Sequence, residues 1–256
     1  MVMIRKIAKD IIGEPAIRNL RRIFSMEAEI TVKRRNFHLQ FLKKGDLFFD
    51  VGANLGNRIF PIVHLGIRII AIEPQQECIE HLKKHFGNKI TIVPKGLGAE
   101  KGEETMFIAD MSILSSFAKD WINETQESGR FSDHQWDEQR TIEMTTLDVL
   151  IEKYGHPDFI KIDVEGYELE VLKGLSQPVK MVSLEYTVPE QTDILIACMI
   201  RLNDICNQNS LFNYSIGESM EWATDKWLSL EEMTKVVNSK EFIDTTFGDI
   251  YMKNKM

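Results

Sequence analysis

Three charged residues alternate at the end of a short apolar segment. Lys161, Asp163 and Glu165 lie two residues apart, within Phe159–Val164 and just beyond it, so on a β-strand they project to one side. Charged groups in an apolar strand are costly to bury unless they are paired. A carboxylate at such a strand end can remove the proton of an attacking hydroxyl, which makes Asp163 the predicted general base.

A further acid, Glu185, ends the next apolar segment, Met181–Tyr186. Glu165 and Glu185 are alternative bases to Asp163, and Lys161 is expected to pair with one of the acids and orient it. A structural alternative treats the same residues as a salt-bridged cluster, with Glu165 favoured by the dipole at a helix N-terminus. The three carboxylates also suit Mg²⁺, which would lower the pKa of an acceptor diol, although their spacing does not demand a metal.

A glycine-containing turn, Asp50–Gly56, follows the apolar segment Leu47–Val51. Such turns bind ligands at the carboxyl ends of parallel strands, because glycine lets the backbone approach closely. Glu73 ends the following apolar segment, where an acid hydrogen-bonds the ribose hydroxyls in nucleotide sites. The predicted cofactor-binding residues are Asp50, Gly52, Ala53, Asn54, Gly56, Asn57, Glu73, Pro74, Gly96 and Leu97.

The same turn indicates which cofactor binds. The GxGxxG pattern of dinucleotide sites is absent, and Asn54 stands at the middle glycine, where Asn tolerates left-handed backbone geometry. S-adenosylmethionine has no pyrophosphate and therefore does not need a helix N-terminus offered to phosphate. Asp50 is expected to meet the ammonium group of its amino-acid end, and the backbone N–H groups of the turn its carboxylate. The turn thus favours S-adenosylmethionine over NAD.

Apolar segments alternate with amphipathic ones along most of the chain, which predicts an α/β fold with a mostly parallel sheet and helices on both faces. The predicted strands are Leu47–Val51, Ile67–Ile72, Ile90–Val93, Phe159–Val164 and Met181–Tyr186. The predicted helices are Glu27–Leu42, Asn57–Leu65, Gln76–Phe86, Thr146–Tyr154 and Tyr167–Lys173. Two more segments, Phe212–Ile216 and Asp249–Met252, are expected to form an antiparallel C-terminal edge.

A long polar insertion, residues 119–140, separates two further predicted strands, Thr105–Ala109 and Thr141–Thr145. Insertions at the active end of an α/β sheet often act as lids over the site. The side chains that would contact a ligand there are Ser115, Ser116, Trp121, His134 and Trp136, and simple packing of the loop is the alternative.

Several stretches resemble motifs of the FkbM family of O-methyltransferases. They are Asp50–Gly56 (DVGANLG), Ile72–Pro74, Thr146–Asp148 (TLD) and, most specifically, Phe159–Gly174 (FIKIDVEGYELEVLKG). The resemblance runs from about Gly45 to Tyr186 and implies a Rossmann-like class I methyltransferase fold with S-adenosylmethionine as methyl donor. It also implies a hydroxyl acceptor on a sugar, a glycan precursor or a secondary metabolite. Residues 1–44 and 190–256 carry no such resemblance.

Length and charge divide the chain into two parts. Its 256 residues suit one large domain, residues 45–256, preceded by a basic helical extension, residues 1–44. The extension has a net charge of +7, within a total of −8, so the acidic body does not favour nucleic acid as a partner. The extension is expected to cap the sheet, form a homodimer or touch an anionic membrane through Arg5, Lys6, Lys9, Arg18, Arg21 and Arg22.

Three functional hypotheses follow from the sequence. The first is an S-adenosylmethionine-dependent O-methyltransferase that acts on a small molecule or glycan in the cytoplasm. The cytoplasmic location is expected because no secretion signal or membrane-spanning segment is recognisable and the cysteines lack disulfide or metal spacing. The second is an NAD-dependent oxidoreductase on the same fold. The third is a non-catalytic binding protein that has kept the nucleotide fold.

Overall fold

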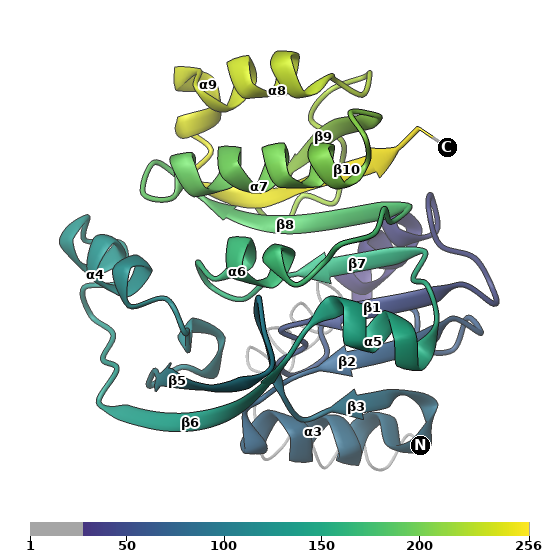
Figure 1. The fold of residues 1–256 in the computed structure, drawn as a ribbon, viewed down its shortest axis with the longest axis vertical. Coiled ribbons are helices and arrows are strands. Elements are labelled where there is room, and N and C mark those ends of the chain that lie inside the picture. Colours follow the sequence, from purple (N-terminus) through teal and green to yellow (C-terminus); the bar gives the residue numbers. More distant parts are fainter. Residues whose placement is uncertain (1–27, 256) are drawn as a thin grey trace, which may run out of the picture.

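The computed structural model describes residues 28–255, which form two β-sheets and the helices around them (Figure 1). The larger sheet has seven strands in the order β3-β2-β1-β7-β8-β10-β9. Their bounds are β1 Leu47–Val51, β2 Arg68–Ile72, β3 Thr91–Val93, β7 Phe159–Ile162, β8 Met181–Thr187, β9 Ser210–Ile216 and β10 Phe247–Asn254. This order places β1 and β7 at the centre. From β1 the strands β2 and β3 follow towards one edge of the sheet, and from β7 the later strands follow towards the other edge.

The central strands are parallel and buried. All five residues of β1 and all four of β7 are buried, because helices cover both faces of the sheet. β1 pairs in parallel with β2 and β7, and β7 pairs in parallel with β8. β10 pairs antiparallel with both β8 and β9. The predicted Rossmann-like architecture and its antiparallel C-terminal edge are confirmed.

The helices form two layers. On one face, the core contains side chains of α5 (Leu147–Tyr154), α6 (Glu168–Lys173), α7 (Thr192–Ile205), α8 (Leu230–Val237) and α9 (Lys240–Ile243). On the other face it contains side chains of α3 (Gln76–Phe86) and of the helix over residues 28–38, drawn in purple behind the sheet in Figure 1. A short 3₁₀ turn, η1 (Gly87–Lys89), follows α3.

The predicted helix Asn57–Leu65 is wrong. This segment forms a series of turns, in which Phe60 N–H donates to the carbonyl of Gly56 at 2.9 Å but no regular helical ladder continues. Pro61 stands in the middle of the segment; it has no N–H group, and its ring clashes with the carbonyl four residues earlier. The apolar spacing survives without the helix, because Ile59 and Ile62 are both fully buried.

A second, smaller sheet lies beside the seven-stranded sheet (Figure 1). It has the order β4-β6-β5, with β4 Gly96–Leu97, β5 Gly102–Ile108 and β6 Glu138–Thr145. The segment between β5 and β6, called the insertion from here on, contains the 3₁₀ turn η2 (Ser112–Leu114) and the helix α4 (Lys119–Glu127), so it begins before the predicted start at residue 119. β6 begins two residues before the end of the predicted insertion, and Trp121 anchors α4 with only 1% of its surface exposed.

The helix over residues 28–38 packs onto the main sheet. Phe37 is 1% exposed and its ring lies 4.6 Å from the ring of Trp222 and 5.5 Å from that of Tyr251. Arg34 and Lys33 form ion pairs with Glu218 and Glu221 at 3.1 and 2.8 Å. This helix therefore caps the sheet together with the segment that follows β9.

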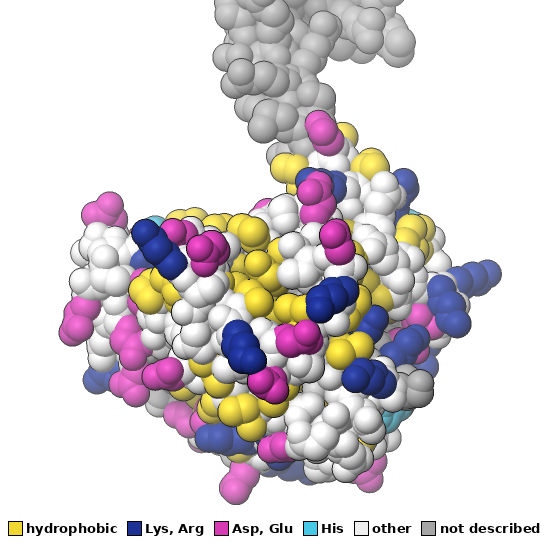
Figure 2. All heavy atoms as spheres, turned by 90° about the horizontal axis from the view of Figure 1, so that it is seen from above, with side chains coloured by type: hydrophobic (Ala, Val, Ile, Leu, Met, Phe, Trp, Pro, Cys, Tyr) yellow, Lys and Arg dark blue, Asp and Glu magenta, His cyan; other side chains and the backbone are white. Residues whose placement is uncertain are grey.

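The basic residues proposed to touch a membrane, and the part of the predicted helical extension before residue 28, lie outside the described residues. Within residues 28–255, none of the helices has the length and apolar character that crossing a membrane requires. Figure 2 shows the side of the molecule on which α8 and α9 lie. Lys and Arg side chains are interspersed there with Asp and Glu, so this face presents no continuous basic surface for phosphates.

Truncating Phe37 to Ala is expected to reduce the free energy of unfolding by about 3–5 kcal/mol, because it leaves a cavity under the capping helix. Val32→Ala on the same helix is the control, since Val32 is 46% exposed and a change within about 0.5 kcal/mol is expected. Urea denaturation of both variants measures the difference. Equal losses would show that the helix does not dock through Phe37.

Candidate active site

The site forms where the backbone after β1 meets the backbone after β7. Asp163 N–H donates to the carbonyl of Val51 at 3.1 Å. Gly52 has a φ of +77°, and a Cβ atom added to it would lie 1.8 Å from the backbone oxygen of Asp163. Glycine is therefore required at position 52 by close packing as well as by backbone conformation.

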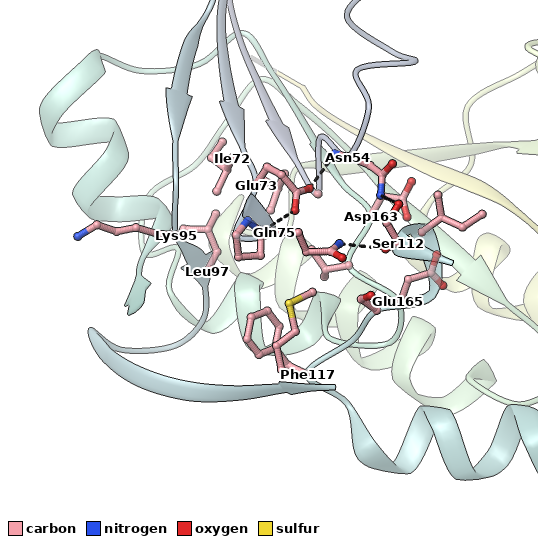
Figure 3. A pocket seen from close by; sticks show the side chains of 18 residues that line it. Asn54, Ile72, Glu73, Gln75, Lys95, Leu97, Ser112, Phe117, Asp163 and Glu165 are labelled. Carbon is pink, nitrogen blue, oxygen red and sulfur yellow. Dashed lines mark hydrogen bonds between the residues drawn. The ribbon is translucent and has the colours of Figure 1, made fainter. Parts of the chain in front are cut away.

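A cavity of about 630 Å³, including its open mouth, lies beside this junction (Figure 3). Six of the residues predicted to bind the cofactor line it, namely Gly52, Asn54, Glu73, Pro74, Gly96 and Leu97. Asp163 and Glu165 also face it. The apolar part of its wall, which suits the flat face of an adenine ring, consists of Val51, Ile72, Leu97, Met106, Ile113, Phe117 and Val164.

Glu73 is fixed at the cavity wall by two backbone groups. Its carboxylate accepts hydrogen bonds from the N–H groups of Asn54 and Gln75, both at 2.8 Å. Only 2% of the residue is exposed. Burial raises the pKa of Glu73 to about 7, although these hydrogen bonds act to lower it. Each carboxylate oxygen keeps a lone pair with which it can accept a hydroxyl.

The start of the insertion closes one side of the cavity. The amide of Asn54 donates to Ser112 Oγ at 3.2 Å, and that of Gln75 donates to the carbonyl of Ser112 at 2.9 Å. Ser112, Gln75 and Lys95 line the cavity but were not predicted from the sequence. Gln75, directly after the Glu73–Pro74 pair, is the only one of these three that a motif could have indicated.

Four of the predicted cofactor residues do not line the cavity. Ala53 is buried in the core, and Asn57 is exposed to solvent. Gly56, with a φ of +82°, is needed for packing, because a Cβ atom there would lie 2.4 Å from the ring of Phe86. Asp50 is buried behind the turn, and its Oδ1 has no hydrogen-bond partner within residues 28–255.

S-adenosylmethionine fits these residues. The buried, unpartnered oxygen of Asp50 would be satisfied by an ammonium group. Glu73 offers its carboxylate to ribose hydroxyls at the cavity wall. When bound, this cofactor supplies an electrophilic methyl group on a positive sulfonium.

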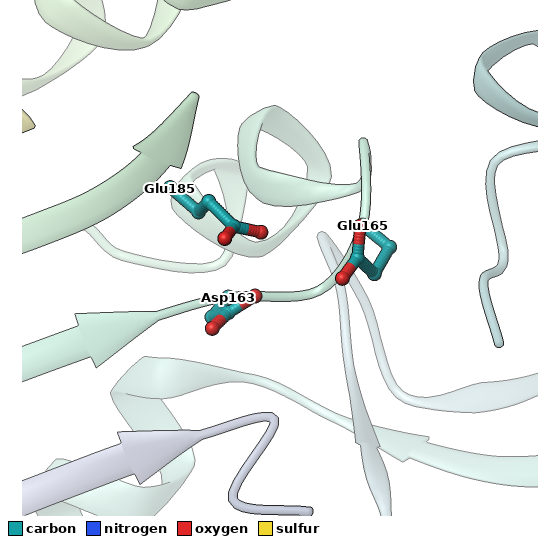
Figure 4. A group of neighbouring side chains, drawn as sticks. All are labelled: Asp163, Glu165 and Glu185. Carbon is teal, nitrogen blue, oxygen red and sulfur yellow. The ribbon is translucent and has the colours of Figure 1, made fainter. Parts of the chain in front are cut away.

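Three acids form a cluster at the ends of β7 and β8 (Figure 4). One carboxylate oxygen from each of Asp163, Glu165 and Glu185 lies within 4.8 Å of the other two. The Lys161 ammonium group contacts the Asp163 carboxylate, and Glu185 also hydrogen-bonds to Asp163. The structure thus brings together the three residues of the alternating pattern and Glu185 from the next strand.

The acids of the cluster differ in their affinity for protons. Burial acts to raise the pKa of Asp163, but Lys161 and the hydrogen bond from Glu185 outweigh it and hold that pKa below its ordinary value. Burial and the negative charge of Asp163 hold the pKa values of Glu165 and Glu185 well above their usual range. Asp163 therefore gives up its proton more readily than either glutamate.

The cluster lies between two cavities. Asp163 and Glu165 line the large cavity, whereas Glu185 lines a second, smaller one of about 350 Å³. Its other walls include Trp121 of α4, Gly166, Thr187 and residues of α7. The carboxylates of the cluster therefore border both cavities.

The loop that carries Glu165 is held by the insertion. Glu165 and Gly166 both have left-handed backbone conformations, with φ of +53° and +86°. The Ser116 hydroxyl donates to the carbonyl of Glu165 at 2.6 Å. A Cβ atom on Gly166 would lie 2.5 Å from the side chain of Trp121. Trp121 and Ser116 thus fix the loop, and α4 packs against it rather than standing open.

Comparison with known proteins agrees with this geometry. The family model described as "Methyltransferase FkbM domain" matches residues 50–213, more than half of the chain. The hexuronic acid methyltransferase AglP of Haloferax volcanii is 27% identical over 151 residues, which cover 57% of this chain and 56% of AglP. The chain therefore spans little more than half the length of this relative.

Similar solved structures are also methyltransferases. A TehB-like S-adenosylmethionine-dependent methyltransferase from Corynebacterium glutamicum is 9% identical, with 93% of this chain and 97% of that chain covered and a TM-score of 0.46. An O-methyltransferase from Bacillus cereus is 10% identical, with 99% and 97% covered and a TM-score of 0.40. Because both scores lie below 0.5, the fold assignment rests on the strand order and the family match.

The raised pKa of Glu73 predicts a pH-dependent stability. Folding favours the protonated form of Glu73. The contribution of this group to the free energy of unfolding is therefore complete below about pH 4.5 and is lost as the pH rises through about 7. Gln cannot ionise. When the pH rises from 4.5 to 8, we therefore expect the free energy of unfolding of Glu73→Gln to fall by roughly 2–3 kcal/mol less than that of the wild type.

Urea denaturation across this pH range measures that difference. Glu80→Gln, an exposed change on α3, is the control and should follow the wild type. If Glu73→Gln also follows the wild type, the Glu73 carboxyl is not buried as described.

Proposed function

This chain belongs to the FkbM family of methyltransferases, and we propose that it transfers the methyl group of S-adenosylmethionine to a hydroxyl of a sugar or glycan. The observation that carries the proposal is the acid cluster between the two cavities, where a hydroxyl can lose its proton beside the methyl donor. The family supports S-adenosylmethionine over the NAD alternative, and the unpartnered Asp50 oxygen supports a ligand with a cationic amino group.

The proposed base is the Asp163–Glu185 pair. Lys161 keeps Asp163 ionised and fixes its position, while the hydrogen bond from Glu185 gives the pair a shared proton. Two such closely coupled acids titrate together, so the proton taken from the acceptor belongs to the pair. Lys161 acts through Asp163 and is a positioning residue. The non-catalytic alternative gains no support from a site whose four charged residues converge.

The charge of the cluster favours a hydroxyl acceptor over a carboxylate. A sugar acid offers both kinds of oxygen, and a carboxylate needs no base because it is already ionised. The cation of the cluster, Lys161, is already paired with Asp163, so the cluster offers no counter-charge to a second carboxylate. A hydroxyl is neutral and needs a base at neutral pH. We therefore expect a methyl ether as the product.

The similarity to a hexuronic acid methyltransferase supports a carbohydrate acceptor, since that relative's name gives its substrate as a hexuronic acid. Mg²⁺ stays a prediction of the sequence: the three carboxylates are spaced to share one cation, but Lys161 already supplies positive charge at Asp163. Omitting Mg²⁺ and adding EDTA in the assay below tests whether a cation is needed.

Asp163→Asn is expected to lower turnover by about 10²–10⁴-fold, because the pair loses its ionised member. Glu185→Gln should lower turnover less and move the pH–rate profile, since the amide can still donate to Asp163. The assay follows labelled methyl transfer to a panel of oligosaccharides. Glu170→Gln on the same motif is the control, because Glu170 pairs with Lys173 on the surface.

All three variants should keep the thermal stabilisation by S-adenosylhomocysteine that the wild type shows and that NAD should not produce. Unchanged turnover in Asp163→Asn would refute the assignment of the base.

The chemical nature of the product gives a separate test. Mild alkali hydrolyses a methyl ester and releases methanol, whereas a methyl ether is stable under the same conditions. We expect the label to stay on the saccharide after alkali. Release of labelled methanol would show that the acceptor is a carboxylate and that the cluster does not act as a base.

A further inference from the structure

An open groove lies on the insertion, between α4 and the β5–β6 sheet, which Figure 1 shows side by side. It encloses about 890 Å³, including solvent-open space. Its residues combine two aromatic rings, four carboxamides, one apolar side chain and one charge of each sign. They are Phe107, Lys119, Ile122, Asn123, Gln126, Gln135, Trp136, Asp137 and Gln139.

The aromatic side of the groove is rigid. The indole N–H of Trp136 donates to the carbonyl of Leu114 at 2.8 Å, which fixes the plane of the ring. Trp136 and Phe107 both pack against the small apolar core that contains Trp121 and Ile122. Both rings therefore offer their remaining surface to a ligand at little conformational cost.

The amide side of the groove is free to bind. Within residues 28–255, the side-chain amides of Asn123, Gln135 and Gln139 have no hydrogen-bond partner, and Gln126 makes only one bond, of 3.3 Å. Gln139 stands directly opposite Phe107 across the β5–β6 ladder, so the two side chains share one face of the sheet.

This combination matches a saccharide. A carboxamide both donates and accepts hydrogen bonds, as a sugar hydroxyl does, and an aromatic ring covers the C–H face of a sugar ring. The charges of Lys119 and Asp137 balance, so the groove lacks the basic character that a phosphate backbone requires. It also lacks the continuous apolar surface that a lipid chain requires.

The groove is connected to the active site by one segment, residues 112–117. Phe107 and Ser116 form a bridge with two backbone hydrogen bonds, of 2.8 and 3.0 Å, and the Ser116 hydroxyl holds the carbonyl of Glu165. Four residues of the same segment, Ser112, Ile113, Ser115 and Phe117, line the cofactor cavity. The segment therefore borders both the cavity and the groove.

We propose that this groove binds a sugar unit of the acceptor's glycan, away from the unit that is methylated. The proposal rests on a glycan being the acceptor, as inferred above. It makes an oligosaccharide a better acceptor than a monosaccharide, because a second bound unit adds affinity without changing the reacting atoms.

Binding of labelled wild-type protein to an array of mono- to hexasaccharides, built from neutral hexoses, N-acetylhexosamines and hexuronic acids, tests the proposal. We expect binding to oligosaccharides that weakens at least tenfold in Asn123→Ala/Gln139→Ala. Asn88→Ala/Gln177→Ala is the matched control, because these exposed amides lie outside the groove and should leave binding unchanged. Both variants should keep the stabilisation by S-adenosylhomocysteine, which shows that they fold.

Binding to none of these saccharides, or binding that the groove variant leaves unchanged, would overturn the proposal. The methyl-transfer assay separates this result from a failure of the proposed function. Methylated saccharide with no effect of the groove variant refutes the groove alone. Groove-dependent saccharide binding without any methyl transfer refutes the proposed reaction and leaves the groove as a binding site.

Discussion

Gly52 and Asp163 meet backbone to backbone at the centre of the sheet, and the remaining parts of the site take their positions from this contact. It can form only because β1 and β7 are adjacent and parallel, so that both chains leave the sheet at the same edge. On one side of the contact lies the cavity closed by Glu73, and on the other lies the acid cluster. A side chain at position 52 would push the backbones of residues 52 and 163 apart.

The second constraint is charge. The negative charge of Asp163 is balanced by Lys161. A further buried cation, Arg58, forms two hydrogen bonds to the Glu218 carboxylate, of 2.7 and 2.9 Å, and lies 3.4 Å from Asp249. Glu218 also pairs with the helix that caps the opposite face of the sheet. The electrostatics of the catalytic edge therefore depend on segments that contribute no atom to either cavity.

The sequence allowed prediction of the parts that follow from local pattern. β1, β2, β7 and β8 are buried on both faces and so appear as apolar runs, and the acids Glu73 and Asp163 are found at the ends of two of them. The helix after the glycine turn was predicted wrongly because apolar spacing outweighed Pro61. The contacts of Ser112 and Arg58 were not predictable, because their partners lie far away in the chain and only the tertiary fold brings them together.

The insertion touches the catalytic loop mainly through backbone: Trp121 packs on the bare Gly166, and Ser116 binds a carbonyl of Glu165. Contacts of this kind specify where the insertion sits, and the groove rings Phe107 and Trp136 support them through the small core that contains Trp121. Exchanges of the exposed side chains on its outer surface, such as Asn123 and Gln139, leave both contacts intact. The fold thereby leaves the outer surface of the insertion open to variation while the acid cluster stays in place.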